Sequence, residues 1–109
     1  MNWIILNDHN QLQQLVEASH QKPQVIFKHS TRCSISIMAK NRLERVAFPD
    51  QIQFHYLDLL QYREISNNIA EQFGVYHQSP QVLLIKNGEC IFEETHSAIS
   101  MDELVDQAM

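Results

Sequence analysis

Short apolar runs alternate with segments of helical periodicity along this chain, and this order constrains the fold more than any other feature. Val25-Ile26-Phe27 and Val82-Leu83-Leu84-Ile85 are continuous apolar runs, a pattern typical of strands that are covered on both faces. Residues 3–6 also indicate a strand. After the cap signal Asn7-Asp8, residues from about 10 to 20 carry apolar side chains at helical spacing. The chain therefore begins with a predicted strand, helix and second strand.

The second half continues the alternation. A helix is predicted from Ser34 until Phe48-Pro49-Asp50 stops it. Residues 52–56 alternate apolar and polar side chains, which predicts a half-buried strand. Residues 64–73 carry apolar side chains four positions apart, and Gly74 follows where a left-handed C-cap residue is expected.

Two local signals define the end of the chain. Asn87-Gly88 is the strongest short hairpin signal, so Cys90-Ile91-Phe92 is predicted to be a strand antiparallel to the apolar run before it. Ser100-Met101-Asp102-Glu103 is a capping box that opens an amphipathic terminal helix. The resulting order, βαβαβαββα, predicts an α/β fold with a mixed central sheet and helices on both faces.

Length and charge limit the number of domains and the kinds of partner. With 109 residues, 44% of them hydrophobic, residues 1–109 are expected to form one domain. Eight Lys and Arg against 13 Asp and Glu give a net charge of −5, which argues against a nucleic-acid partner. The apolar runs are far shorter than the roughly 20 residues of a membrane span, and no secretory segment is visible. We therefore expect a cytoplasmic protein with neither membrane nor nucleic acid as partner.

The two cysteines, Cys33 and Cys90, are interpreted differently. Both are expected to be free thiols in a reducing compartment, and the six scattered histidines show no spacing typical of a metal site. Cys33 lies where a buried strand ends and a helix begins, at which point free backbone N–H groups stabilise a thiolate. The alternative, a small buried hydrophobe, fits poorly with the neighbouring Thr31, Arg32 and Ser34. Cys90, in an apolar strand, is interpreted as a structural thiol.

Basic residues gather around Cys33. Residues 28–45 contain five basic residues and one acid, a local charge of +4 in an acidic chain. Such a field favours a thiolate and an anionic small partner, for which Lys28 and Arg32 are the candidate charges. His29, without an identified acid partner, is interpreted as a turn residue. Three basic residues farther along the helix could equally form only a solvated face: Lys40, Arg42 and Arg45.

The order of elements, Cys33 at a strand-to-helix turn and Ser79-Pro80 before the penultimate strand together resemble the thioredoxin fold. The segment Phe27-Lys28-His29-Ser30-Thr31-Arg32-Cys33-Ser34-Ile35-Ser36 is similar to the monothiol bacilliredoxin family, the YtxJ-like proteins of the bacillithiol system. The family pattern there is Cys-Pro-Ile-Ser, and Ser34 replaces its proline. The serine N–H can donate toward the sulfur, as proline cannot. Ser36 occupies the position of the second cysteine of dithiol thioredoxins.

The resemblance implies a monothiol thiol–disulfide oxidoreductase. Its single nucleophile, Cys33, would remove a low-molecular-weight thiol, bacillithiol, from S-thiolated proteins, with that thiol as co-substrate and no tightly bound cofactor. The Ser79-Pro80 bond is predicted to be cis and to lie against the Cys33 turn. The residues expected to form the substrate site are Thr31, Arg32, Ser34, Ile35, Ser36, Ser79 and Pro80.

Two other functions remain open at this point. A non-catalytic thioredoxin-like binding module would use the same groove to hold a peptide or a partner. A dithiol reductase would use Cys90 to resolve a mixed disulfide on Cys33. The separation of the two cysteines, 57 positions in the sequence, does not decide between neighbouring and distant placement.

Overall fold

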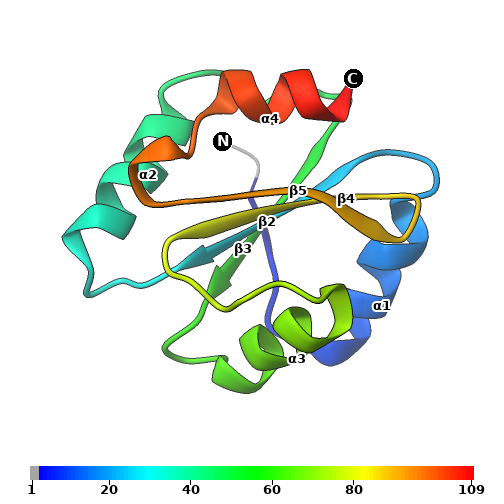
Figure 1. The fold of residues 1–109 in the computed structure, drawn as a ribbon, viewed down its shortest axis with the longest axis horizontal. Helices are drawn as coiled ribbons and strands as arrows, with labels where there is room; N and C mark the ends of the chain where they lie inside the picture. The colour runs from blue at the N-terminus through cyan, green and yellow to red at the C-terminus, as the bar shows by residue number, and fades with distance from the viewer. Residues whose placement is uncertain (1–2) are drawn as a thin grey trace.

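The computed structural model describes residues 3–109, and the elements follow the predicted order (Figure 1). The strands are β1 (Trp3–Ile5), β2 (Gln24–His29), β3 (Gln53–Asp58), β4 (Gln81–Lys86) and β5 (Glu89–Thr95). The helices are α1 (His9–Ala18), α2 (Ser34–Glu44), α3 (Arg63–Phe73) and α4 (Met101–Ala108), with a 3₁₀ turn η1 (His96–Ala98) before α4.

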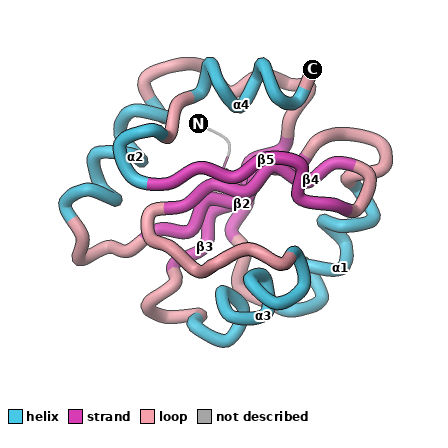
Figure 2. Tube along the Cα trace, viewed as in Figure 1, coloured by secondary structure: helices cyan, strands magenta, loops and turns pink. Residues whose placement is uncertain are grey.

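The five strands form one mixed sheet in the order β1-β3-β2-β4-β5 (Figure 2). Strands β1 and β2 both run parallel to β3, whereas β4 runs antiparallel to β2 and to β5. Parallel pairs need crossover connections, which α1 and α2 provide. The carboxyl ends of β1, β2 and β3 therefore meet at one edge of the sheet, and the amino end of β4 joins them there.

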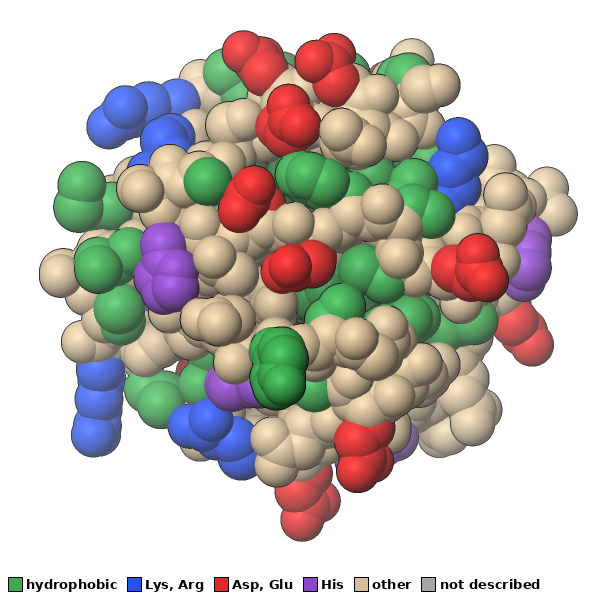
Figure 3. All heavy atoms as spheres, in the orientation of Figure 1, with side chains coloured by type: hydrophobic (Ala, Val, Ile, Leu, Met, Phe, Trp, Pro, Cys, Tyr) green, Lys and Arg blue, Asp and Glu red, His purple; other side chains and the backbone are tan. Residues whose placement is uncertain are grey.

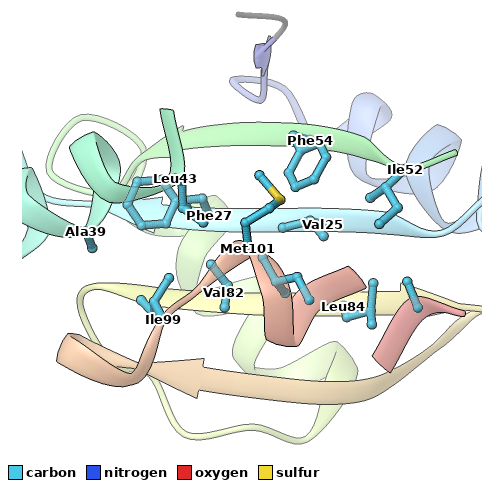
Figure 4. Packing of buried hydrophobic residues seen from close by; sticks show 12 residues of the cluster. Val25, Phe27, Ala39, Leu43, Ile52, Phe54, Val82, Leu84, Ile99 and Met101 are labelled. Carbon is cyan, nitrogen blue, oxygen red and sulfur yellow. The ribbon is translucent and has the colours of Figure 1, made fainter. Parts of the chain in front are cut away.

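Helices cover both faces of the sheet, with α4 on one side and α1 and α3 on the other (Figure 1). Alternate residues of β2 and β4 enter two separate cores. Phe27 and Val82 pack with α2 and with Met101 of α4, as Figure 4 shows. Ile26 and Leu83 pack with the apolar side chains of α1 and α3. The prediction that these two strands are covered on both faces is confirmed, and each such side chain contributes about 1.5–3 kcal/mol by leaving water.

Two sequence-based expectations need correction. Helix α2 ends at Glu44, before the predicted stop at Phe48. The burial of β3 does not follow the predicted alternation, because the polar His55 is only 7% exposed whereas the neighbouring Tyr56 is partly exposed. The Nε2 atom of His55 lies 2.7 Å from Oε1 of Gln24, and burial lowers the pKa of His55 to about 4.

The local turn and cap signals are confirmed. Gly74 adopts the left-handed conformation after α3, with φ of 65°, and Asn87-Gly88 turns the hairpin with φ values of 53° and 81°. The Ser100 hydroxyl accepts a hydrogen bond from the Glu103 N–H at the start of α4. Within residues 3–109, no helix is long and apolar enough to cross a membrane.

Candidate active site

Cys33 is the N-cap residue of α2, with an extended backbone at φ −105° and ψ 120°. Its N–H donates to the Ser30 carbonyl at 3.2 Å, which closes a turn, and its own carbonyl accepts from the Ile37 N–H at 3.0 Å. The thiol is free and partly exposed. The N–H groups of the first helical turn have no partner within the helix, and the Cys33 side chain makes no cap hydrogen bond to them. The positive end of the helix dipole lies at the same turn.

Most of the predicted neighbours of Cys33 are solvent-accessible. Thr31, Arg32 and Ser34 are exposed, and the Ile35 side chain is 47% exposed. Ser36 is the exception, because it is fully buried. The prediction that Ser36 contacts substrate directly is therefore not supported by its position.

The Ser36 hydroxyl instead fastens the turn that carries Cys33. Its Oγ accepts a hydrogen bond from the Ser30 N–H at 3.0 Å and lies 2.7 Å from Nδ1 of His29. Burial, and then the nearby Lys40, lower the pKa of His29, so its ring is neutral near pH 7 and can accept the serine proton. His29 is thus a buried strand residue stacked on Phe27, not a turn residue.

Ser79 and Pro80 lie at the same edge of the sheet as Cys33. Lys28 near the end of β2 pairs with Gln81 at the start of β4, so Pro80 lies just beyond this pair. The Ser79-Pro80 peptide bond is cis, as predicted. The carbonyl of Pro80, which is buried, accepts a hydrogen bond from the His96 N–H at 3.1 Å, and this joins η1 to the same edge.

Two of the basic residues on α2 have structural partners and do not form a solvated face. Arg42 donates to the carbonyls of Ile99 and His96, at 2.9 and 3.2 Å. Lys40 forms a 2.7 Å ion pair with Glu44 one turn along the helix. Arg45 is exposed, in agreement with the solvated alternative.

Comparison with known families gives one match over most of the chain. A family model described as "Monothiol bacilliredoxin BrxC" matches residues 4–104. The chain belongs to the monothiol bacilliredoxin family. This membership implies thiol–disulfide exchange, and it confirms the resemblance seen in the residues around Cys33.

Solved structures confirm the thioredoxin-like fold of this bacilliredoxin. A thioredoxin-fold protein provisionally assigned as an oxidoreductase is 29% identical, with a TM-score of 0.85 over 97% of this chain and 93% of that one. Thioredoxin from Malassezia sympodialis is 19% identical, with a TM-score of 0.78 over 96% of this chain and 90% of its own. Thioredoxin from Fasciola hepatica is 15% identical, with a TM-score of 0.79 over the full length of both chains.

Lys28 of the bacilliredoxin is not a surface charge beside Cys33, contrary to the expectation from the sequence. It is fully buried, because strand alternation directs it to the α3 face while His29 faces α2. Its Nζ donates to the Ser66 carbonyl at 3.1 Å and lies 3.3 Å from Nδ1 of His77. Burial, and then the nearby Arg63, lower the pKa of Lys28 to about 8.

His77 and Arg63 were missed by the sequence reasoning. Their positions, 14 residues apart on the α3 helix and the loop after it, carry no recognisable motif. The available signal was Lys28, a charged residue directly after an apolar run that was expected to be covered on both faces. Such a residue needs polar partners from the elements that cover it.

Cys90 lies at the opposite end of the sheet from Cys33. It pairs with Ile85, which in turn pairs with Gln24 at the start of β2, whereas Cys33 follows the end of β2. Six residues of strand separate the two ends by about 16 Å, while a disulfide requires Cα atoms within about 7 Å. Burial raises the pKa of the Cys90 thiol, which packs against the core beneath α1 and α3. The geometry supports a structural thiol and argues against Cys90 as the resolving cysteine.

Proposed function

We propose that this bacilliredoxin removes a low-molecular-weight thiol, bacillithiol, from mixed disulfides on protein cysteines, using Cys33 alone. The observation that carries the proposal is a single accessible thiol at the N-cap of α2, with a buried serine hydroxyl three residues later and the second cysteine at the far end of the sheet. A mixed disulfide on Cys33 then has no thiol within the chain to resolve it.

The proposed step is a thiol–disulfide exchange with no net change in oxidation. The Cys33 thiolate attacks the small-thiol sulfur of the mixed disulfide, and the bond to the protein sulfur breaks. The substrate protein leaves as a thiolate that takes a proton from solvent. A second low-molecular-weight thiolate later attacks the small-thiol sulfur of the adduct, and the bond to the Cys33 sulfur breaks. The two small thiols leave together as a disulfide, and the Cys33 thiolate is regenerated.

The residues around Cys33 suit an extended substrate. Thr31, Arg32, Ser34 and Ile35 are exposed beside the thiol and would contact the substrate, with Arg32 providing positive charge. Ser79, which is partly exposed, would form the opposite wall with the buried Pro80 behind it, because strand pairing places both at the same sheet edge. Low-molecular-weight thiols stay reduced in the cytoplasm, which is where we place the protein and its S-thiolated substrates.

Intact-mass spectrometry tests the proposal directly. A protein with one cysteine blocked by bacillithiol is mixed with the bacilliredoxin, and both masses are followed through the reaction. We expect one small-thiol adduct on Cys33 and a freed substrate thiol, followed by release of the adduct when low-molecular-weight thiol is added. Trapping of the substrate protein on Cys33 would reverse the direction of attack. The absence of any exchange would favour a non-catalytic binding module.

A further inference from the structure

Three basic side chains meet on the α3 side of the sheet edge that carries Cys33. Lys28 Nζ lies 3.3 Å from Nδ1 of His77, and Nη1 of Arg63 lies 3.3 Å from Nε2 of the same ring. Ser66 completes the group, with its Oγ 3.0 Å from His77 Nδ1. We refer to Lys28, Arg63 and His77 as the basic triad. Its members run from a fully buried ammonium to an exposed guanidinium.

No carboxylate forms an ion pair with this triad among the residues that the structure describes. The one ion pair within residues 3–109 joins Lys40 and Glu44 on α2. Glu93, the acid on the neighbouring strand β5, accepts its hydrogen bond from the Gln81 amide. The charges that act on His77 are Lys28 and Arg63, and both lower its pKa after burial does. A buried cation without an acidic partner destabilises the folded state. An anionic ligand bound at the triad would supply the missing negative charge.

The basic triad contrasts with the net negative charge of the protein. The chain as a whole carries a net charge of −5. Figure 3 shows acidic side chains over the middle and top of the visible face, where β5 and α4 lie, and also at the bottom over α3; most basic ones lie along the side of α2 and near the start of α3. A cationic site in an acidic protein concentrates and orients small anions there.

Lys28, the buried member of the triad, lies five residues before Cys33 in the chain. The Cα atoms of Lys28 and Cys33 are at most about 14 Å apart, because two extended residues span about 7 Å and the hydrogen-bonded turn of residues 30–33 holds its ends within about 7 Å. A cleft of about 560 Å³ lies beside Arg63 between the starts of α1 and α3, and the carboxylates of Asp8 and Glu64 also line it. The side of Arg63 that faces His77 is therefore the better place for an anion.

We infer that the basic triad is a carboxylate-binding subsite for the small-thiol half of the mixed disulfide. Arg63 and His77 would donate to the carboxylate, while the buried Lys28 keeps the His77 ring in place and maintains a positive potential behind it. The inference rests on the proposed function, because it assigns the part of the substrate that is held when Cys33 attacks the small-thiol sulfur.

Paired disulfides of different charge test the subsite. One neutral peptide with a single cysteine is blocked either with mercaptosuccinate, which carries two carboxylates, or with the uncharged 2-mercaptoethanol. The rate of adduct formation on Cys33 is measured for the wild type, Arg63→Gln, His77→Gln and the control Arg45→Gln, which removes one exposed charge from the other end of α2. Each variant is compared with the wild type on the same disulfide, so the intrinsic reactivities of the two thiols cancel.

We expect Arg63→Gln to slow exchange with the mercaptosuccinate disulfide about fivefold, the equivalent of one partly exposed ion pair, and to leave the mercaptoethanol disulfide within about twofold. His77→Gln should act in the same direction, and Arg45→Gln should preserve the preference. A third peptide, with aspartates beside a mercaptoethanol disulfide, separates the source of the carboxylate. If Arg63→Gln slows only this acidic peptide, the triad recognises the protein partner and the inference is wrong.

Failure of the inference differs from failure of the proposed function. If the wild type exchanges both small-thiol disulfides but Arg63→Gln slows them equally or not at all, the subsite is refuted and the exchange activity stands. If the wild type exchanges neither disulfide, the proposed function itself fails. Arg63 is exposed, so its replacement should leave folding intact, and equal urea midpoints for the variant and the wild type verify this.

Discussion

Replacing the buried Lys28 by methionine should make this bacilliredoxin more stable at neutral pH. Burial lowers the pKa of Lys28 from 10.5 to about 8, so the folded state disfavours the ammonium form. A shift of that size corresponds to about 3 kcal/mol of destabilisation wherever Lys28 is charged in both states. Methionine fills a similar volume. His77 Nδ1 keeps its contact with Ser66 Oγ, and the Ser66 carbonyl, which also accepts from Lys28, lies within α3 and so has the N–H group four residues later as a partner. We expect Lys28→Met to gain about 2–3 kcal/mol at pH 7.

The pH dependence identifies the cause. Between pH 8 and 10.5 the unfolded chain holds a proton on Lys28 that the folded chain has lost, so the contribution of Lys28 to the stability of the wild type rises with pH across this window. The advantage of Lys28→Met should therefore be largest below pH 8 and should shrink toward pH 10.5. Cys90 and Tyr56 also titrate at high pH, but both proteins contain them. Their contributions therefore cancel in the difference between the two free energies of unfolding.

Urea unfolding at a series of pH values from 7 to 10.5, with a phosphine reductant to keep both thiols reduced, measures this difference. Lys22→Met is the matched control, because it removes the same charge from a partly exposed position. Its effect on the free energy of unfolding at pH 7 should be small. An advantage of Lys28→Met that is absent at pH 7, or that stays constant up to pH 10.5, would refute the account of an uncompensated buried cation.

Four further outcomes follow from the described contacts. Cys33→Ser should abolish mixed-disulfide exchange while Cys90→Ser leaves its rate nearly unchanged, and a Cys33–Cys90 disulfide found by mass spectrometry during turnover would contradict the sheet geometry. Ser36→Ala should cost about 1–3 kcal/mol in urea unfolding, because it leaves the Ser30 N–H and His29 Nδ1 without their partner; no loss would mean that water replaces the hydroxyl. Gly74→Ala should cost about 1 kcal/mol through its φ of 65° alone, since a Cβ there meets no other atom, and a larger loss would point to a clash. The contribution of His55 to the free energy of unfolding should fall by about 3 kcal/mol as the pH falls from 6.5 to 4, because His55 is protonated in the unfolded chain before it is protonated in the folded one. Urea unfolding of His55→Gln should therefore show a smaller decrease over this range.

The fold was predictable because each of its elements has a local signal. The apolar runs in β2 and β4 indicated cover on both faces, and Gly74, Asn87-Gly88 and Ser100 marked where elements end or begin. The error in β3 has a physical cause. His55 looks solvent-facing by alternation, but the amide of Gln24 satisfies its ring nitrogen and so permits burial.

The position of Cys33 was predictable, and the groups that support its turn were not. Cys33 could be placed from the end of an apolar run and the start of a helix, which are both local features. The partners of Ser36 and Lys28 depend on the rotation of α2 and on the path of the loop before Pro80, which only tertiary packing determines. Sequence reasoning therefore placed Ser36 on the substrate surface and Lys28 in the field around the thiol, and both are buried.

Adjacent buried polar residues at the end of β2 support the Cys33 turn and the loop before Pro80. Strand alternation directs His29 to the α2 face, where it binds Ser36 and holds the turn that carries Cys33. The same alternation directs Lys28 to the α3 face, where it contacts His77 three residues before Pro80. A strand end with two apolar residues would pack at lower cost, but it would leave both the turn and the loop without these anchors. The stability that is lost by burying Lys28 at neutral pH is therefore linked to the position of the loop before Pro80. Lys28→Met should separate the two effects, because it should raise stability while loosening that loop.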